Sequence, residues 1–272
     1  MSADVLKEEN MEENKGEVAE LIERGKNCYK QGKYAEALES FDKALEKDPD
    51  NDELLLNRGV MLIKLGKYEE AVNSFDKALE GGSNDTEALS ARGYALIKLG
   101  RSKEAIDSFD RAVEESPDSA NMWFDRAFAL AKLGRLEEAI ESYSRVVEID
   151  PAYVNAWLGK GVELGGLDRQ QEAIDSLDKA LEIDPKNIDA LNFKGFAFYK
   201  LGMFEEAKKS YDKALKINPN SLHTLKFVVI LLNKLGRYEE ALETCEKALK
   251  IDPWNSFILK KKLNIERKIQ NL

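Results

Sequence analysis

The chain has 272 residues, a formal net charge of -10 and 43% hydrophobic residues, which supply enough apolar surface for a sizeable core. The acidic excess argues against a nucleic-acid partner, because the phosphate backbone is itself a polyanion. The longest apolar run, Phe227 to Leu232, is far shorter than a membrane span, and the opening segment is too acidic for a signal peptide, so we expect a cytoplasmic protein without a membrane partner. Two cysteines, Cys28 and Cys245, and a single histidine, His223, leave few groups for a metal site or for acid-base catalysis.

The prolines mark an internal repeat, because all six fall at spacings of 34 residues or twice 34. With Val18 as position 1, seven units of this length fill the middle of the chain. Every unit has alanine at position 20, and most have glycine at positions 8 and 15, a large side chain at position 24 and alanine at position 27. The units are 18–51, 52–85, 86–119, 120–153, 154–187, 188–221 and 222–255.

Each unit is predicted to form two helices joined by a turn. A position-15 glycine such as Gly66 follows a helical apolar pattern and precedes an acidic pair such as Glu69 and Glu70, which indicates a helix end and then a helix start. Small residues at positions 8 and 20 opposite a large residue at position 24 predict that the two helices approach closely. We therefore expect fourteen repeat helices from seven units, and no strands.

The segments at the two ends differ from the repeats. Residues 1–17 are expected to be an acidic tail or a frayed extension of the first helix. Residues 256–272 form an amphipathic pattern and are expected to cap the last hairpin, with Leu259, Leu263 and Ile269 covering it and basic side chains on the outer side.

Two units depart from the common pattern. Unit 5 has Gly165 and Gly166 near the end of its first helix, which predicts either a hinge or frayed helix end, or a place where a ligand backbone approaches closely. Unit 2 ends in Gly81-Gly82-Ser83 instead of an acidic residue and proline, and this predicts a second soft joint.

The repeat resembles the tetratricopeptide repeat (TPR) family in its length of 34, in Trp123 and Trp157 at position 4, and in glycine at 8, alanine at 20 and 27, an aromatic residue at 24 and proline at 32. The resemblance covers residues 18–255. It implies an all-α fold, an α-solenoid in which seven TPR helix-turn-helix hairpins and a capping helix form a right-handed superhelix.

One side of each first helix is predicted to face a ligand. Helical periodicity places positions 3, 4, 7, 8, 10, 11 and 14 in a packing arc roughly 160° wide, and the resemblance implies that the other positions line the concave side of the superhelix. Positions 5, 9 and 12 are mainly apolar there, so we expect either an exposed partner-binding stripe or side chains that meet those of neighbouring repeats and leave little groove. The candidate groove residues are Leu56, Val60, Ile63, Tyr94, Ile97, Phe124, Phe128, Leu158, Val162, Asn192, Phe196, Tyr199, Lys226 and Ile230.

More specialised sites are not matched by the sequence. No three consecutive repeats supply the lysines and asparagines with which TPR co-chaperones clamp a terminal carboxylate, and position 6 lacks the recurrent asparagine of the glycosyltransferase-associated superhelices. No Walker loop, Gly-x-Ser-x-Gly elbow or paired Cys-x-x-Cys occurs. We therefore predict no catalytic residue, no metal site and no cofactor.

The sequence favours a noncatalytic scaffold that binds an extended or helical segment of another protein in its concave groove. Self-association is an alternative, because an acidic N-terminal segment and a basic C-terminal helix could join molecules end to end as a homo-oligomer. A second alternative is an accessory or regulatory subunit of an enzyme such as a glycosyltransferase.

Overall fold

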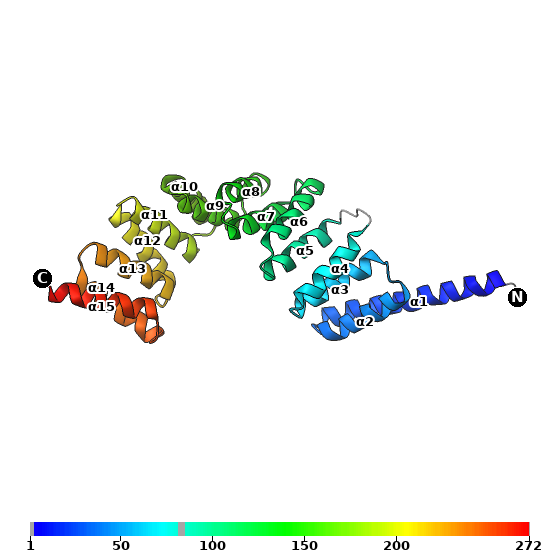
Figure 1. Cartoon of the computed structure of the whole chain (residues 1–272). Helices are drawn as coiled ribbons and strands as arrows, with labels where there is room; N and C mark the ends of the chain where they lie inside the picture. Colours follow the sequence, from blue (N-terminus) through cyan, green and yellow to red (C-terminus); the bar gives the residue numbers. More distant parts are fainter. Residues whose placement is uncertain (1–2, 81–84, 272) are drawn as a thin grey trace. The chain divides into compact units, whose positions relative to one another are not determined.

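The computed structural model describes residues 3–80 and 85–271, with side chains from residue 14 onward. Within these ranges the chain forms fifteen helices and no strand, as the repeat pattern predicts (Figure 1). The predicted soft joint at Gly81-Gly82-Ser83 lies outside the described residues.

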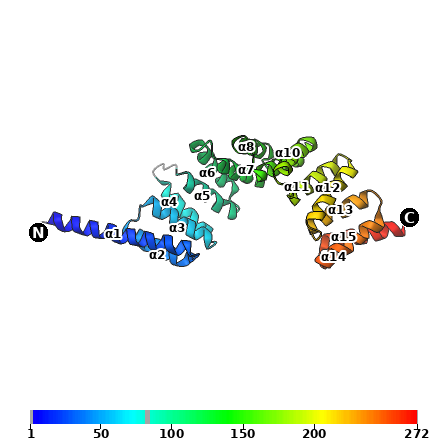
Figure 2. The same cartoon turned by 180° about the vertical axis from the view of Figure 1, so that it is seen from behind.

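The helices fall into two compact units, Met1–Arg135 and Leu136–Leu272, which can be followed from both sides in Figures 1 and 2. The first unit contains α1 (Ala3–Lys30), α2 (Tyr34–Lys47), α3 (Asp52–Lys64), α4 (Tyr68–Ala78), α5 (Thr86–Lys98), α6 (Ser102–Glu115) and α7 (Ala120–Lys132). The second contains α8 (Leu136–Ile149), α9 (Val154–Gly166), α10 (Gln170–Ile183), α11 (Ile188–Lys200), α12 (Phe204–Ile217), α13 (Leu222–Lys234), α14 (Tyr238–Ile251) and α15 (Ser256–Gln270).

Antiparallel hairpins stack in chain order within each unit. In the first unit α1 packs on α2, α3 on α4 and α5 on α6, and the first helices of successive hairpins also touch, α3 with α5 and α5 with α7. In the second unit α9, α11 and α13 form the corresponding row, with α10, α12 and α14 as their partners. The chain is therefore an all-α helical repeat solenoid. The backbone of α1 is helical from Ala3, so it includes most of the segment expected to be a tail or a frayed extension.

Close contact between the helices of a hairpin depends on the glycine at position 8. A Cβ atom placed on Gly93 of α5 would lie 2.5 Å from Cζ of Phe109 on α6, and one on Gly59 would lie 2.4 Å from Cε1 of Phe75. Phe109 and Phe75 are themselves almost completely buried. In these units the aromatic ring at position 24 occupies the space that a side chain at position 8 would take, which favours glycine there. Units 4 and 7 have Ala127 and Val229 at this position instead.

The helix ends follow the signals in the sequence. Asn51 caps the start of α3, where its Oδ1 accepts a hydrogen bond from the backbone N–H of Leu54 at 3.1 Å. The turn glycines at position 15, such as Gly66 with φ 75°, adopt the left-handed conformation that ends the first helix of a hairpin. In unit 5 the non-glycine residue Asp168 takes that conformation, with φ 56°.

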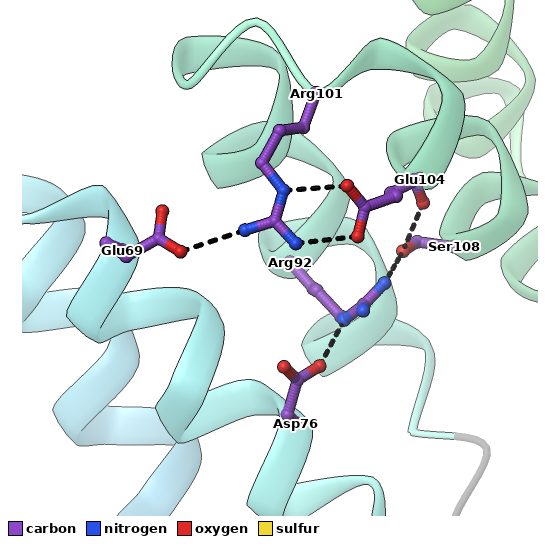
Figure 3. Close-up of polar contacts among 6 residues, drawn as sticks. All are labelled: Glu69, Asp76, Arg92, Arg101, Glu104 and Ser108. Atoms are coloured by element: carbon purple, nitrogen blue, oxygen red, sulfur yellow. Dashed lines mark hydrogen bonds and ion pairs between the residues drawn. The ribbon is translucent and has the colours of Figure 1, made fainter.

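A ladder of polar contacts joins neighbouring hairpins, and the sequence analysis did not identify it. Arg92 at position 7 of α5 donates from Nε to Oδ1 of Asp76 on α4 at 2.6 Å and from Nη1 to Oγ of Ser108 on α6 at 2.7 Å (Figure 3). One guanidinium therefore ties the second helix of the preceding hairpin to the second helix of its own. The arrangement recurs at Arg58 with Asp42 and Ser74, and Arg126 forms the corresponding bond to Asp110.

Helix α15 packs on the last hairpin, and of the three residues predicted to cover it Ile269 does so while Leu259 and Leu263 do not. Ile258 and Ile265 are fully buried against α13 and α14, and Ile269 packs beside them. Leu259 and Leu263, expected to point inward, are exposed. Leu263 stands at position 8, which in the hairpins faces position 24 on the second helix of the same unit, and no second helix follows α15 among the described residues.

Candidate functional site

The first helices of each unit carry the predicted groove residues on one face, here called the A-helix surface and defined by positions 5, 9 and 12. In the first unit none of the seven predicted residues on this surface is buried. Residues three or four positions apart along a helix are separated by about one turn, so their shared face follows directly from helix geometry. These residues are Leu56, Val60 and Ile63 on α3, Tyr94 and Ile97 on α5, and Phe124 and Phe128 on α7.

A groove with a volume of about 810 Å³ opens on the A-helix surface of the first unit. Three of the predicted residues, Val60, Ile63 and Tyr94, supply much of its apolar lining, together with Met122. The lining also contains polar residues, among them Thr86, Ser90, Ser116, Ser119 and Asp125.

Two aromatic rings remain accessible on this surface. Tyr94 is 46% exposed and Phe128 is 42% exposed, although both are large hydrophobic side chains. Lys98 Nζ lies 5.2 Å from the centre of the Tyr94 ring, and Lys132 Nζ lies 5.2 Å from that of Phe128. The lysines at position 13 thus accompany the aromatic residues at position 9 as cation-π partners, one turn further along the helix.

Asp125 is a polar residue of the groove that the sequence analysis did not single out. Ser90 Oγ on α5 donates a hydrogen bond to Asp125 Oδ2 on α7 at 3.4 Å. Burial raises the pKa of the Asp125 carboxyl, and the bond from Ser90 only partly opposes this effect. A signal was present in the sequence, because Ser90 interrupts the mainly apolar positions 5, 9 and 12, and Asp125 directly follows Phe124 of that set.

The A-helix surface of the second unit is more closely packed. Most of its predicted residues are half-buried, but Asn192 is fully buried, so the prediction that it lies in an open groove is wrong. Neither Nδ2 nor Oδ1 of Asn192 has a hydrogen-bond partner. The half-buried residues are Leu158 and Val162 on α9, Phe196 and Tyr199 on α11, and Lys226 and Ile230 on α13.

Aromatic contacts explain why this second surface is less open. The Phe196 ring lies 6.2 Å from that of Tyr199 and 5.7 Å from that of Phe227 on α13. Phe227 in turn stacks on Tyr211 at 5.5 Å, and His223 lies 4.9 Å from it. The stripe therefore differs along the chain: a groove opens in the first unit, whereas in the second unit Phe196 meets Phe227 of the neighbouring repeat.

Reactive groups are few in the described part of the chain. No group of three or more histidine, cysteine, aspartate or glutamate residues is arranged to hold a metal ion among the described residues. None of the helices described here combines the length and the apolar character needed to cross a membrane. Cys28 and Cys245 are both buried, and burial raises the pKa of the Cys245 thiol to about 11, so this thiol stays protonated at neutral pH.

Family models described as tetratricopeptide repeat match residues 22–86, 90–154, 188–221 and 230–255, and one described as TPR repeat matches 167–202. No curated protein sequence matches the chain. A tetratricopeptide repeat protein from Parabacteroides merdae ATCC 43184 is similar in structure, with TM-score 0.68 and 20% identity over 92% of this chain and 98% of that one. YrrB, described as a TPR protein with an unusual peptide-binding site, has TM-score 0.61 and 26% identity over 69% and 97%. MamA from Desulfovibrio magneticus RS-1 has TM-score 0.60 and 24% identity over 63% and 97%.

Proposed function

Because this chain belongs to the tetratricopeptide repeat family, whose repeats serve as protein-interaction modules, we propose that it binds a segment of a partner protein on its A-helix surface. The observation that carries the proposal is the groove of the first unit, where Tyr94 and Phe128 stay accessible beside an apolar lining that includes Val60 and Ile63. Exposed aromatic groups beside a preformed groove are typical anchors, since they bury much area on binding at little conformational cost.

The side chains around the groove indicate the chemistry of the segment. Val60, Ile63 and Tyr94 favour apolar side chains, while the exposed Lys98 and Lys132 stand beside the aromatic rings and favour acidic ones. We therefore propose a peptide or helical segment that has apolar anchors flanked by aspartate or glutamate. The description of YrrB as having a peptide-binding site supports a peptide as the ligand class.

The proposal gives the chain a scaffolding role and assigns it no reaction. Its groove offers hydroxyl groups, the carboxyls of Glu87 and Asp125, the ammonium group of Lys64 and apolar surface, but the lining residues include no histidine or cysteine. Any reaction connected with the complex is assigned to the bound partner.

The test is a groove variant, Tyr94→Glu with Phe128→Glu. Two carboxylates in place of the aromatic anchors should weaken capture of the native partner at least tenfold, because such anchors carry a few kcal/mol of binding. Partners are identified by affinity purification from the source organism with mass spectrometry, and circular dichroism monitors folding. Leu133→Glu is the matched control, since Leu133 is a similarly exposed hydrophobic residue outside the groove.

The outcomes separate binding from folding. Both variants should keep their helicity, with unfolding free energies within about 0.5 kcal/mol of the parent, as exposed sites usually do. A folded groove variant that captures the same partners with the same affinity would contradict the proposal. An unfolded groove variant would show that Tyr94 and Phe128 are needed for the core.

Self-association is a second candidate function, and the C-terminal end favours it. Trp254, Leu259 and Leu263 are exposed there beside the basic side chains of α15, and the sequence of residues 1–17 is acidic, so a second copy has complementary charge. Static light scattering over a concentration series tests it at low and high salt. A mass that rises with concentration and falls back in Leu263→Glu supports this candidate, and a constant monomer mass rejects it.

A further inference from the structure

A small cavity of about 210 Å³ lies between α9 and α11, with α10 supplying part of its wall. Val162 and Phe196, both predicted groove residues, line it together with Phe193. Gly165 and Gly166 form the side contributed by the end of α9, and Gln170 at the start of α10 supplies the polar group.

The cavity exists because two positions of unit 5 depart from the repeat. Position 12 is Gly165, where α3 and α5 have Ile63 and Ile97. Gly165 lies within regular helix α9 without positive φ, and a Cβ atom on it would make only ordinary contacts, the nearest at 3.8 Å to Gln170 Oε1. Neither backbone conformation nor crowding therefore explains this glycine, which weakens the helix by about 1 kcal/mol relative to alanine.

Position 17 is the second departure. Gln170 stands where the first two hairpins have Tyr34 and Tyr68, and it is only 6% exposed. Its Nε2 donates to the carbonyl oxygen of Gly165 at 3.1 Å and reaches Asp168 Oδ1 at 3.5 Å. Its Oε1 is buried without a hydrogen-bond partner. If the amide of Gln170 were flipped, its oxygen would face the carbonyl oxygen of Gly165, so the orientation with Nε2 at that carbonyl is favoured. Gln170 Oε1 therefore lies on the side where Gly165 has no Cβ atom.

An apolar cavity with one unsatisfied buried acceptor selects its ligand. A cavity of about 150 Å³ is known to hold benzene, so this larger one has room for a fused bicyclic ring. The lining side chains offer no free hydrogen-bond donor, because Nε2 of Gln170 already donates to the carbonyl oxygen of Gly165. A tyrosine ring is therefore a poor ligand, since its hydroxyl oxygen would be buried without a donor to accept from. An indole ring carries a donor and no acceptor.

We propose that this cavity takes the indole ring of a tryptophan on the partner segment, with its N–H donating to Gln170 Oε1. The assignment rests on the proposed function, since Val162 and Phe196 place the cavity on the A-helix surface of the second unit.

The first experiment titrates free indole into the full chain and follows the ¹³C methyl signals of Val162. Indole should bind in roughly the millimolar range expected for a ligand of this size. Indene has the same fused-ring shape without the N–H donor and should bind about tenfold more weakly, the loss expected for one hydrogen bond. Equal binding of the two ligands, or no binding of either, would overturn the proposal.

Two variants locate the site. Gly165→Ile restores the residue type found in α3 and α5, should fill the cavity and should abolish the indole-dependent shifts, while Ala131→Ile makes a similar change at position 12 of α7 and should leave them unchanged. Gln170→Leu removes the acceptor and should erase the preference for indole over indene, with indene still bound. Circular dichroism confirms that each variant is folded. Retained indole binding in a folded Gly165→Ile variant, or a retained preference in Gln170→Leu, would overturn the site.

Partner capture separates this inference from the proposed function. Gly165→Ile should weaken capture, and free indole should compete with the partner. Unchanged capture by Gly165→Ile, with capture lost in the Tyr94→Glu, Phe128→Glu variant, overturns the indole site and leaves the proposed function standing.

Trp254 of a second copy is the other source of an indole, because it is 87% exposed. If the chain self-associates, and both Gly165→Ile and Trp254→Ala abolish this, the indole comes from a second copy and the assignment to a partner protein is overturned.

Discussion

Asn192 shows at the scale of one residue how a polar side chain can cost stability. It lies on α11 with no exposed surface and no partner for either amide atom. Leu56 and Leu158 occupy the same repeat position in α3 and α9, so a leucine fits this register. We predict that Asn192→Leu raises the unfolding free energy by about 1–3 kcal/mol, because the desolvation cost of an unsatisfied amide disappears. Chemical denaturation measures the change.

Asn187 at the start of the same helix provides the control. Its Oδ1 accepts a hydrogen bond from the backbone N–H of Ala190 at 2.9 Å and so caps α11. Asn187→Ala should therefore lower the unfolding free energy by about 1 kcal/mol. A destabilised Asn192→Leu variant would mean that Asn192 has bonding partners that the folded chain needs.

Asp125 makes the stability of the first unit depend on pH. Burial raises the pKa of its carboxyl in the folded chain, so folding favours the protonated form. The stabilising contribution is complete below the ordinary aspartate pKa of about 4 and is lost as the pH rises through the raised value of the folded state. Asp125→Asn should therefore raise the melting temperature at pH 7, and this gain should shrink toward pH 4.

Differential scanning calorimetry between pH 4 and pH 7 checks this dependence. Asp107→Asn, which changes an exposed carboxylate on α6, should alter the melting temperature little at any pH. An Asp125→Asn gain that is constant across the pH range would contradict the assignment of the effect to Asp125.

A single residue could be predicted from the sequence when the residues that it contacts lie in its own repeat. The position-8 glycines could be predicted, because Gly93 and its ring partner Phe109 belong to one repeat and recur along the chain. Asn192 could not, since a polar residue on a helix face suggests exposure and its burial comes from the packing of other helices. Gln170 was missed for a related reason: its importance arises only together with Gly165.

At the scale of an element, α15 shows that one amphipathic pattern can have two apolar faces. Ile258, Ile265 and Ile269 form one face, and Leu259 with Leu263 forms the other. Periodicity alone does not choose between them, because the choice depends on which face meets α13 and α14. The sequence was thus sufficient to predict the helix and its capping position, but not its orientation about its own axis.

A pair of alanine substitutions tests the orientation of α15. Ile265 is fully buried, so Ile265→Ala should lower the unfolding free energy by about 2–4 kcal/mol through lost burial and the cavity left behind. Leu263→Ala removes the same number of carbon atoms from a side chain that is 50% exposed and should cost less than about 1 kcal/mol. Urea unfolding of both variants gives the comparison, and equal losses would contradict the observed register.

At the scale of the whole molecule, the strong helix contacts are all local in sequence. Every well-populated contact between the described helices joins neighbours or next-but-one neighbours, as with α5 and α6 or α5 and α7. The 34-residue repeat was sufficient to predict this architecture, because most units carry their own turn glycine and their own close contact between the two helices. The openness of the A-helix surface was left undecided by the sequence, since Tyr94 and Phe196 occupy the same repeat position yet only Phe196 packs against other aromatic rings.

Local contacts predict that damage to one hairpin spreads only to its neighbours. In Gly93→Ala the new methyl group would stand 2.5 Å from Phe109, and such overpacking typically costs about 1–3 kcal/mol. Stability in a linear array is close to a sum of unit and nearest-neighbour terms. Amide hydrogen exchange followed by mass spectrometry should therefore show faster exchange in α5 and α6, a smaller effect in α4 and α7, and no change in α13 and α14.

The control is Gly16→Ala, because a Cβ atom at Gly16 would have no atom within 4 Å, and this variant should not speed exchange in any helix. If exchange instead accelerates equally in every helix of Gly93→Ala, the chain unfolds as one cooperative whole and the nearest-neighbour account is wrong.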